Sequence, residues 1–191
     1  MLFGKYCSRS LDMTSDNCPA SSASIAQMPY EQFQKVIAEC ALTFRASAKR
    51  NVLLLHHNDT DGLSSGAILS KALERMRLHV RRYCLEKPYP QVIDRLLNDE
   101  FIASDTVVVL ADFGSGMLPS IAAINRERFP IYILDHHAPN AAPDRCITLI
   151  NPRACGVDGD QDCSASALCA LFAQELGEFN DDLWVLGALG A

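Results

Sequence analysis

The sequence predicts an α/β fold in which a parallel β-sheet is flanked by helices. Short apolar runs of strand length alternate along the chain with segments of helical apolar periodicity, as expected for strand–helix–strand units. Three of the apolar runs end in acidic and imidazole side chains, which are the groups that open α/β sheets present to ligands at the carboxyl ends of their strands.

The bulk composition is that of one globular domain with a hydrophobic core. Of 191 residues, 49% are hydrophobic and 21% are charged, and the net charge is -6. This charge argues against a broad basic surface for duplex DNA but leaves room for a local basic groove. No apolar run approaches the roughly 18 residues of a membrane span. Without a signal peptide at the N-terminus, we expect a cytoplasmic protein with no membrane association.

The eight cysteines do not form a recognisable metal or disulfide framework. None lies in a C-x-x-C pair, and a chain of this length is stable without disulfides. Cys40 and Cys169 fall in helical apolar patterns and Cys84 in a strand, so we expect most of the cysteines to be small buried side chains.

The chain divides into three parts. Residues 1–28 are rich in Ser, Asp, Asn and Pro without an apolar period, and we expect a mobile tail there. Residues 29–49 have the apolar stripe of one amphipathic helix. Residues 50–191 form the α/β domain.

The α/β domain begins with an apolar strand and continues in alternation. We expect strands at 52–56, 78–85, 106–111, 130–134 and 146–150. We expect helices at 63–76, 91–97, 118–125 and 165–176, and a last one opening at 181 or 182. Ser164 is placed to cap the fourth of these helices.

The turn after the first strand carries three potential ligands. His57, Asp59 and Asp61 alternate in sequence, so in an extended segment all three point to one face. A lone D-x-D-G sequence is also typical of a turn that caps a helix. The other strand ends decide between these readings.

The first strand run ends in H-N-D-T-D-G, the third in A-D-F-G and the fourth in D-H-H. Parallel strands bring these ends to one edge of the sheet. Carboxylates and imidazoles crowded there are poorly solvated and repel each other unless a cation lies between them. The sequence therefore predicts a metal site.

The chemistry of this site follows from its ligand types. Oxygen and nitrogen ligands without thiolate favour Mn²⁺ or Mg²⁺, and Zn²⁺ and Co²⁺ are also compatible. There are enough carboxylates for two ions about 3.5–4 Å apart with a bridging Asp, an arrangement that activates water and neutralises an anionic phosphodiester.

These motifs resemble those of the DHH phosphoesterase superfamily. Asp135-His136-His137 is similar to its signature triplet, His57–Gly62 to its first motif and Ala111–Gly114 to its second. Asn151-Pro152-Arg153, followed by G-V-D-G-D and S-A-S, resembles RecJ-like exonucleases, the archaeal ones especially. The resemblance covers about residues 50–191 and implies the parallel α/β catalytic domain of that family.

The resemblance also implies a role for each motif residue. His57 and Asp59 would hold one metal ion, Asp61 and His136 a second, and Asp112 would bridge them. His137 would face the scissile phosphate, and Asp135 would orient the site by hydrogen bonding. Arg153 and Ser65 are candidate contacts to substrate phosphate, as are Arg81 and Arg82. We expect His56 to finish the first strand or to face inward, without binding metal, and His79 to lie on the surface.

The implied function is hydrolysis of phosphodiester bonds in single-stranded nucleic acid or short oligonucleotides, with replication or repair proteins as candidate partners. Cyclic dinucleotides and pyrophosphate stay open as substrates. Nucleotide binding by a G-x-G-x-x-G loop is disfavoured, because Pro119 stands where the third glycine should fall.

One departure from the family pattern supports an alternative. The fourth motif usually ends in a metal-binding Asp after a run such as L-G-A-L-G, but here Ala191 follows that run. We expect a chain truncated before the family's C-terminal substrate-binding domain. The alternative is a non-catalytic nucleic-acid or replication-complex module on a degenerate fold of this family.

Overall fold

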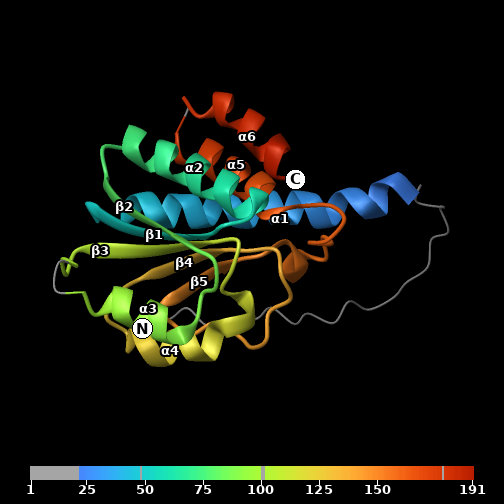
Figure 1. Ribbon diagram of the computed structural model, residues 1–191. Helices are drawn as coiled ribbons and strands as arrows, with labels where there is room; N and C mark the ends of the chain where they lie inside the picture. Colours follow the sequence, from blue (N-terminus) through green and yellow to red (C-terminus); the bar gives the residue numbers. More distant parts are fainter. Residues whose placement is uncertain (1–21, 48, 100–101, 178) are drawn as a thin grey trace.

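Five parallel strands form one sheet in the order β2-β1-β3-β4-β5 in the computed structural model (Figure 1). The structure describes residues 22–47, 49–99, 102–177 and 179–191. The strands are β1 (Asn51–His57), β2 (His79–Leu85), β3 (Thr106–Ala111), β4 (Ile131–Leu134) and β5 (Ile147–Ile150).

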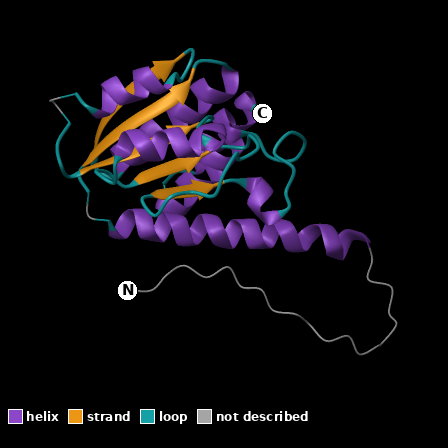
Figure 2. Cartoon of the chain, turned by 90° about the horizontal axis from the view of Figure 1, so that it is seen from below, coloured by secondary structure: helices purple, strands orange, loops and turns teal. Residues whose placement is uncertain are grey.

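Helices cover both faces of this sheet. One face carries α1 (Ser22–Ala46), α2 (Thr60–Arg75), α5 (Ala165–Leu176) and α6 (Trp184–Gly190), with α6 on the outside of α2 and α5 (Figure 1). The other face carries α3 (Pro90–Leu97) and α4 (Leu118–Asn125). Short 3-10 turns occur at Ser115–Met117, Pro152–Cys155 and Asp181–Leu183. Seen from below, α1 runs along one side of the molecule (Figure 2).

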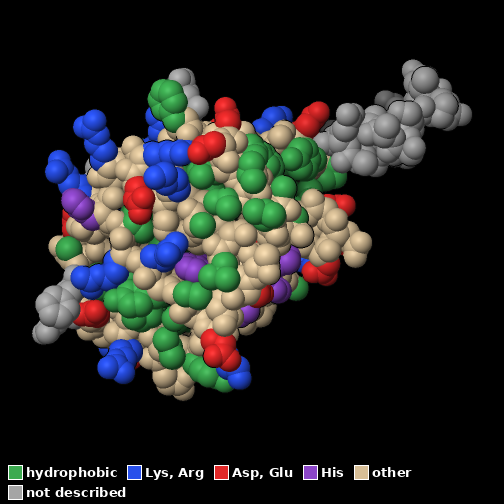
Figure 3. All heavy atoms as spheres, turned by 45° about the horizontal axis from the view of Figure 1, so that its top comes forward, with side chains coloured by type: hydrophobic (Ala, Val, Ile, Leu, Met, Phe, Trp, Pro, Cys, Tyr) green, Lys and Arg blue, Asp and Glu red, His purple; other side chains and the backbone are tan. Residues whose placement is uncertain are grey.

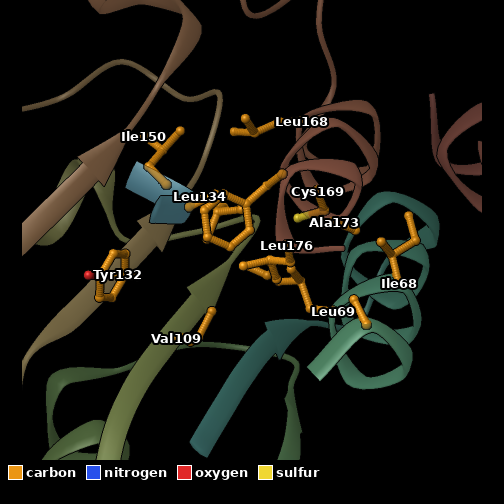
Figure 4. Close-up of a cluster of buried hydrophobic side chains, with 14 of the residues drawn as sticks. Ile68, Leu69, Val109, Tyr132, Leu134, Ile150, Leu168, Cys169, Ala173 and Leu176 are labelled. Carbon is orange, nitrogen blue, oxygen red and sulfur yellow. The ribbon is translucent and has the colours of Figure 1, made fainter. Parts of the chain in front are cut away.

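The alternation of side chains along each strand divides the core into two layers. In β3, Val107 and Val109 face the cluster under α1, α2 and α5, whereas Val108 and Leu110 face the cluster under α3 and α4. Both sets are buried, which explains why the strand is apolar at every position. In the larger cluster, residues of β3–β5 meet residues of α2 and α5 (Figure 4).

Aromatic packing fixes α1 to the rest of the domain. The ring of Phe44 lies edge-on to Tyr132 of β4 and to Phe172 of α5, with centroids 5.0 and 6.0 Å away. Phe33 and Ile37 of α1 are buried in the same cluster. The helix therefore belongs to the core of the α/β domain rather than forming a separate part.

The last helix, α6, approaches its neighbours closely through glycines. A Cβ atom on Gly190 would lie 2.4 Å from the Ser166 hydroxyl and 2.9 Å from the Ser64 Cβ atom, and one on Gly187 would lie 3.0 Å from the Ala170 Cβ atom. The L-G-A-L-G run is thus adapted to pack against α2 and α5, and it brings the end of α6 beside the start of α5.

The predicted fold class is confirmed, and most elements lie within one or two residues of the predicted bounds. The expectation for the N-terminal region was partly wrong. Residues 22–28 are the first turns of α1, because their Ala, Gln and Met residues favour helix and Pro29 removes a single hydrogen bond without ending it. The rest of the expected tail lies outside the described residues. Cys84 is exposed rather than buried, since β2 is an edge strand.

Among the helices that the structure describes, none combines the length and apolarity needed to cross a membrane.

Candidate metal centre

The candidate site lies at the carboxyl edge of the sheet, where the chain order reverses. From β1 the chain goes to β2 on one side, and β3 then pairs with β1 on the other side. His57 is the last residue of β1, Asp112 follows β3 and Asp135 follows β4. Because His56 pairs with Ala111, and Ala111 with Leu134, these strand ends stand at one level. Ligands of open α/β folds bind at such a reversal.

Asp112 is at the centre of the site. Its side chain is almost fully buried, with Oδ2 3.8 Å from Nδ1 of His57 and Oδ1 3.6 Å from Nε2 of His136. Its φ of 64° lies in the left-handed region, which Asp and Asn adopt more readily than other non-glycine residues. One carboxylate therefore faces two imidazoles, one from each side of the crevice.

The electrostatics at Asp112 fit a cation. Burial raises the pKa of this carboxyl, and the nearby charges of Asp61 and Asp59 raise it further, although the hydrogen bond with His136 opposes them. The site thus brings three carboxylates close together, one of them buried. A divalent cation would compensate this charge, and carboxylates and imidazoles are ligands that such ions bind.

The first half of the site consists of His57 and Asp59. The His57 Nε2 atom is 3.2 Å from the Glu86 carbonyl oxygen, so that Nδ1 faces Oδ2 of Asp59 at 2.9 Å. The other Asp59 oxygen accepts a hydrogen bond from the Gly62 N–H and caps α2. Burial raises the pKa of Asp59, but the bonds from Gly62 and His57 outweigh it and the net shift is downward.

The second half consists of His136 and Asp61. The His136 Nδ1 atom is 2.6 Å from the Gly159 carbonyl oxygen, which leaves Nε2 facing Asp112 and, at 3.8 Å, Oδ2 of Asp61. The hydrogen bond with Asp112 raises the pKa of His136 to about 9, against the effect of burial. Asp61 in turn accepts the Ala165 and Ser166 N–H groups at the start of α5.

His137 and Asp135 form a third, adjoining pair. Oδ1 of the buried Asp135 lies 2.7 Å from Nδ1 of His137, and its Oδ2 accepts the Ser115 N–H at 2.8 Å. The hydrogen bond with Asp135 raises the pKa of His137, whose side chain is 58% exposed. Burial raises the pKa of Asp135, but the bonds from His137 and Ser115 lower it overall. The pair presents an oriented imidazole to the solvent side of the site.

The structure thus brings the predicted ligands together in two groups that share Asp112. Within each group the ligand atoms lie within 4.8 Å of one another; the groups are His57, Asp59 and Asp112, and Asp112, His136 and His137. Asp61 joins the second through its contact with His136. Which of these residues bind metal stays a prediction.

The predicted substrate contacts fare less well. Ser65 is fully buried, so the expectation that its hydroxyl contacts substrate was wrong: it lies on the core side of α2. Arg153 is paired with Asp160 and with the His136 carbonyl. Arg81 lies 3.6 Å from Asp99 on the edge strand β2. His56 is buried against Gly66 and His79 is exposed, both as expected.

Sequence reasoning missed the backbone groups that orient the ligands. The carbonyls of Glu86 and Gly159 and the first N–H groups of α5 all contact predicted ligands. Every residue has these groups, so the sequence carries no signal for them. Gly62 and Gly159 are a partial exception, because both leave no room for a side chain.

An open pocket of about 340 Å³ adjoins the site. Its lining includes three of the site residues, His57, Asp112 and His137, and three apolar side chains, Pro88, Phe113 and Met117. On the face seen in Figure 3, several histidine side chains lie at one margin beside acidic ones, and other acidic side chains are spread over the face, while Lys and Arg lie mostly toward the opposite side.

The fold and the site define a parallel α/β domain with a candidate divalent-metal centre at the carboxyl edge of its sheet. The chain belongs to the DHH family: the model of the DHH family N-terminal domain matches residues 51–189. It is 36% identical over 142 residues to an uncharacterised protein of Methanocaldococcus jannaschii, covering 73% of this chain and 32% of that protein. The chain thus spans about a third of this relative's length.

Solved structures share the fold. RecJ of Thermus thermophilus, in complex with Mn²⁺, superposes with a TM-score of 0.64 at 17% identity, over 82% of this chain and 24% of that one. The DHH domain of a member of a ribosomal protein family superposes with a TM-score of 0.65 at 20% identity, over 83% of this chain and 43% of that one. CDC45 of Entamoeba histolytica superposes with a TM-score of 0.57 at 16% identity, over 88% of this chain and 32% of that one.

Proposed function

We propose that this domain is the catalytic part of a divalent-metal-dependent phosphoesterase that hydrolyses phosphodiester bonds of single-stranded nucleic acid or short oligonucleotides. The observation that carries the proposal is the position of Asp112, a buried carboxylate with each oxygen facing a different imidazole. The family and the likeness to Mn²⁺-bound RecJ support the same reading and favour Mn²⁺, with Mg²⁺ as the alternative.

Each residue then has a defined task. His57 and Asp59 would hold one ion, Asp61 and His136 a second, and Asp112 both. Bound there, two dications would lower the pKa of water and neutralise the phosphodiester. Asp135 keeps Nδ1 of His137 engaged, which leaves the opposite ring edge free to donate a hydrogen bond or proton to the phosphate.

The pocket beside the site favours an ester that carries a nucleoside over pyrophosphate. Pro88, Phe113 and Met117 add apolar surface to its lining, which a chain of phosphates does not use, whereas a sugar and base would bury it. Of the small substrates considered, short oligonucleotides and cyclic dinucleotides therefore fit better than pyrophosphate.

The proposal is tested with the full-length protein, Mn²⁺ and end-labelled single-stranded DNA and RNA, with pyrophosphate assayed in parallel. We expect nucleotide release that stops with EDTA and returns with Mn²⁺, and little release of phosphate from pyrophosphate. Hydrolysis that persists in EDTA, or that is confined to pyrophosphate, would contradict the proposal.

A non-catalytic module that binds nucleic acid or replication proteins is the second candidate. It is favoured by Ala191, which stands after L-G-A-L-G where the family pattern has a metal-binding Asp. The end of α6 lies beside Ser166, whose N–H holds Asp61, so this position adjoins the second half of the site. Metal-independent binding of single-stranded DNA with no turnover would support this candidate.

A further inference from the structure

The loop from Asn151 to Asp160 follows β5 and lies against the backbone of the D-H-H motif. The Asn151 side chain donates a hydrogen bond to the carbonyl of His137 at 2.9 Å. The Nε atom of Arg153 donates one to the carbonyl of His136, also at 2.9 Å. Two side chains of one loop therefore hold two successive carbonyls of the motif.

The same loop also holds the His136 ring. The Gly159 carbonyl oxygen is 2.6 Å from Nδ1, so this nitrogen carries the proton and Nε2 is the one that faces Asp112 and Asp61. Metal-binding histidines characteristically donate their second ring N–H to a carbonyl or carboxylate, which fixes both tautomer and ring orientation. Gly159 occupies that place for His136.

Arg153 connects the two ends of the loop. One Nη atom lies 2.6 Å from Oδ2 of Asp160, while its Nε atom is bonded to the His136 carbonyl. Because the guanidinium is planar and rigid, these two bonds fix the residue next to Gly159 at a set distance from the motif. The Asp160 side chain is 67% exposed, and an exposed ion pair contributes little to stability, so the role of this pair is geometric.

The approach of Gly159 to His136 leaves no room for a side chain. A Cβ atom on Gly159 would lie 2.2 Å from the His136 carbonyl oxygen and 3.0 Å from Nε of Arg153. A methyl group there has to separate the loop from the motif. The N-P-R and G-V-D-G-D stretches thus have a common structural purpose.

We propose that Arg153, Gly159 and Asp160 act as positioning residues that set His136 for metal binding. Arg153 then serves the motif rather than the substrate phosphate. The inference rests on the proposed function, because it requires His136 to bind an ion. It goes further than that function, because it states that a loop without any of the proposed ligands determines how tightly one ion binds.

The test compares Gly159→Ala with Gly177→Ala in the full-length protein. A Cβ atom on Gly177 meets nothing closer than 4.0 Å, and its φ of 173° is ordinary extended backbone, so this control adds the same methyl group without a clash. Mn²⁺ binding is followed by electron paramagnetic resonance titration and calorimetry, and folding by thermal melting in EDTA.

For Gly159→Ala we expect one ion to bind with unchanged affinity and the other about 10–100-fold more weakly, which is the usual cost of losing such a partner of a ligand. Gly177→Ala should bind both ions as the wild type does. If the loop only supported the fold, the affinity for both ions would fall together. The affinity for the first ion, held by His57 and Asp59, therefore distinguishes positioning of His136 from general structural support.

Arg153→Ala and Asp160→Asn test the link without adding volume, and they carry the test if Gly159→Ala does not fold. Each should weaken the same ion, and the double variant should be no weaker than Arg153→Ala alone, because both remove one connection. Arg153→Lys should not restore affinity, since an ammonium group lacks the rigid fork that joins the two partners.

The outcomes separate this inference from the proposed function. Wild-type protein that binds no ion would overturn both. Wild-type protein that binds two ions, with Gly159→Ala and Arg153→Ala also binding both at unchanged affinity, would overturn the positioning role and leave the proposed function intact. An equal loss of affinity for both ions in these variants would also overturn the positioning role.

Discussion

The two halves of the candidate metal centre take their proposed ligands from the chain in different ways. His57 and Asp59 belong to one strand and the turn that follows it, and the Asp59 side chain is 56% exposed. Asp61 and His136 depend on distant partners: Asp61 on the start of α5, 104 residues further along, and His136 on Gly159, 23 residues away. The proposed ligands of the first half are therefore neighbours in sequence, whereas those of the second come from separate elements. Both halves still need the folded domain, because the His57 ring is held by the Glu86 carbonyl, 29 residues away.

Asp112→Asn should disable both halves of the site, because Asp112 is the carboxylate that they share. Asn tolerates the left-handed backbone at this position but offers one oxygen instead of two. We expect turnover to fall roughly 10³-fold, in the range found when a main electrostatic group of an active site is lost. Thermal melting in EDTA should show no loss of stability, because the substitution removes a buried charge repelled by its neighbours. Unchanged Mn²⁺-dependent hydrolysis would contradict the bridging role.

Asp59→Asn and Asp61→Asn form a matched pair that sharpens the comparison. Each should weaken one ion by about 10²-fold, as expected for loss of a charged ligand. Their stabilities should differ, because Asn is as good an N-cap as Asp for α2, whereas Asp61 uses both oxygens to accept two N–H groups of α5. Asp61→Asn leaves one of these unpaired, at a cost of about 1–3 kcal/mol.

Chemical denaturation in EDTA measures this difference. Equal stability of the two variants would show that Asp61 does not hold α5. Calorimetry on the two single variants and on the double variant shows whether they affect different ions, and a double variant that binds no more weakly than either single variant would contradict the division of the site into halves.

The pH dependence of metal binding should also distinguish the halves. The pKa of His136 is about 9 without metal, so a proton has to leave before Nε2 can bind an ion. Affinity at the second half should rise about tenfold per pH unit and level off above pH 9. The same raised pKa stabilises the metal-free fold fully below pH 6.5, and this contribution is lost as the pH rises through 9.

The check is Mn²⁺ affinity and metal-free melting temperature between pH 6 and pH 10, in the wild type and in His136→Gln. The substitution should remove the rise of Mn²⁺ affinity with pH at the second half. It should also remove the decrease in stability of the metal-free protein as the pH rises. A slope that persists in His136→Gln would assign the titration to another group.

Ala191→Asp should have the smallest effect and act on the second half alone. The end of α6 packs beside Ser166, which holds Asp61, so a carboxylate there adds a ligand of the kind that the family's fourth motif supplies. We expect the affinity of the second ion to rise about tenfold, equivalent to about 1.4 kcal/mol. Ala191→Asn is the control of similar shape without the charge, and an equal gain in both would exclude coordination by the new carboxylate.

The sequence predicted which side chains come together in both halves, but not the backbone groups that orient them. The alternation of His57, Asp59 and Asp61 and the three polar strand ends located the centre because parallel strands have a common carboxyl edge. The contacts of Asp61 with α5 and of His136 with Gly159 could not be read in this way, since backbone donors and acceptors leave no mark on residue type. Ser65 was assigned wrongly because a Ser near the motif looks polar in sequence, although its position on α2 faces the core.

The same division applies to the fold. Buried strands such as 106–111 are apolar throughout and were found with the bounds that the structure gives. The start of α1 was missed because Ser and Ala residues before Pro29 carry no apolar period, and only the rest of the helix, packed through Phe33 and Phe44, shows one.

The left-handed backbone at Asp112 has a consequence for how this family diversifies. Gly, Asn and Asp are the residues that adopt this conformation with least strain, so Asn is among the substitutions that cost the backbone least. Asn is one base change from Asp in the genetic code, and it keeps the shape of the crevice while removing the charge. If the proposed hydrolysis were lost in this way, the whole domain could therefore be kept as a binding surface after a single mutational step.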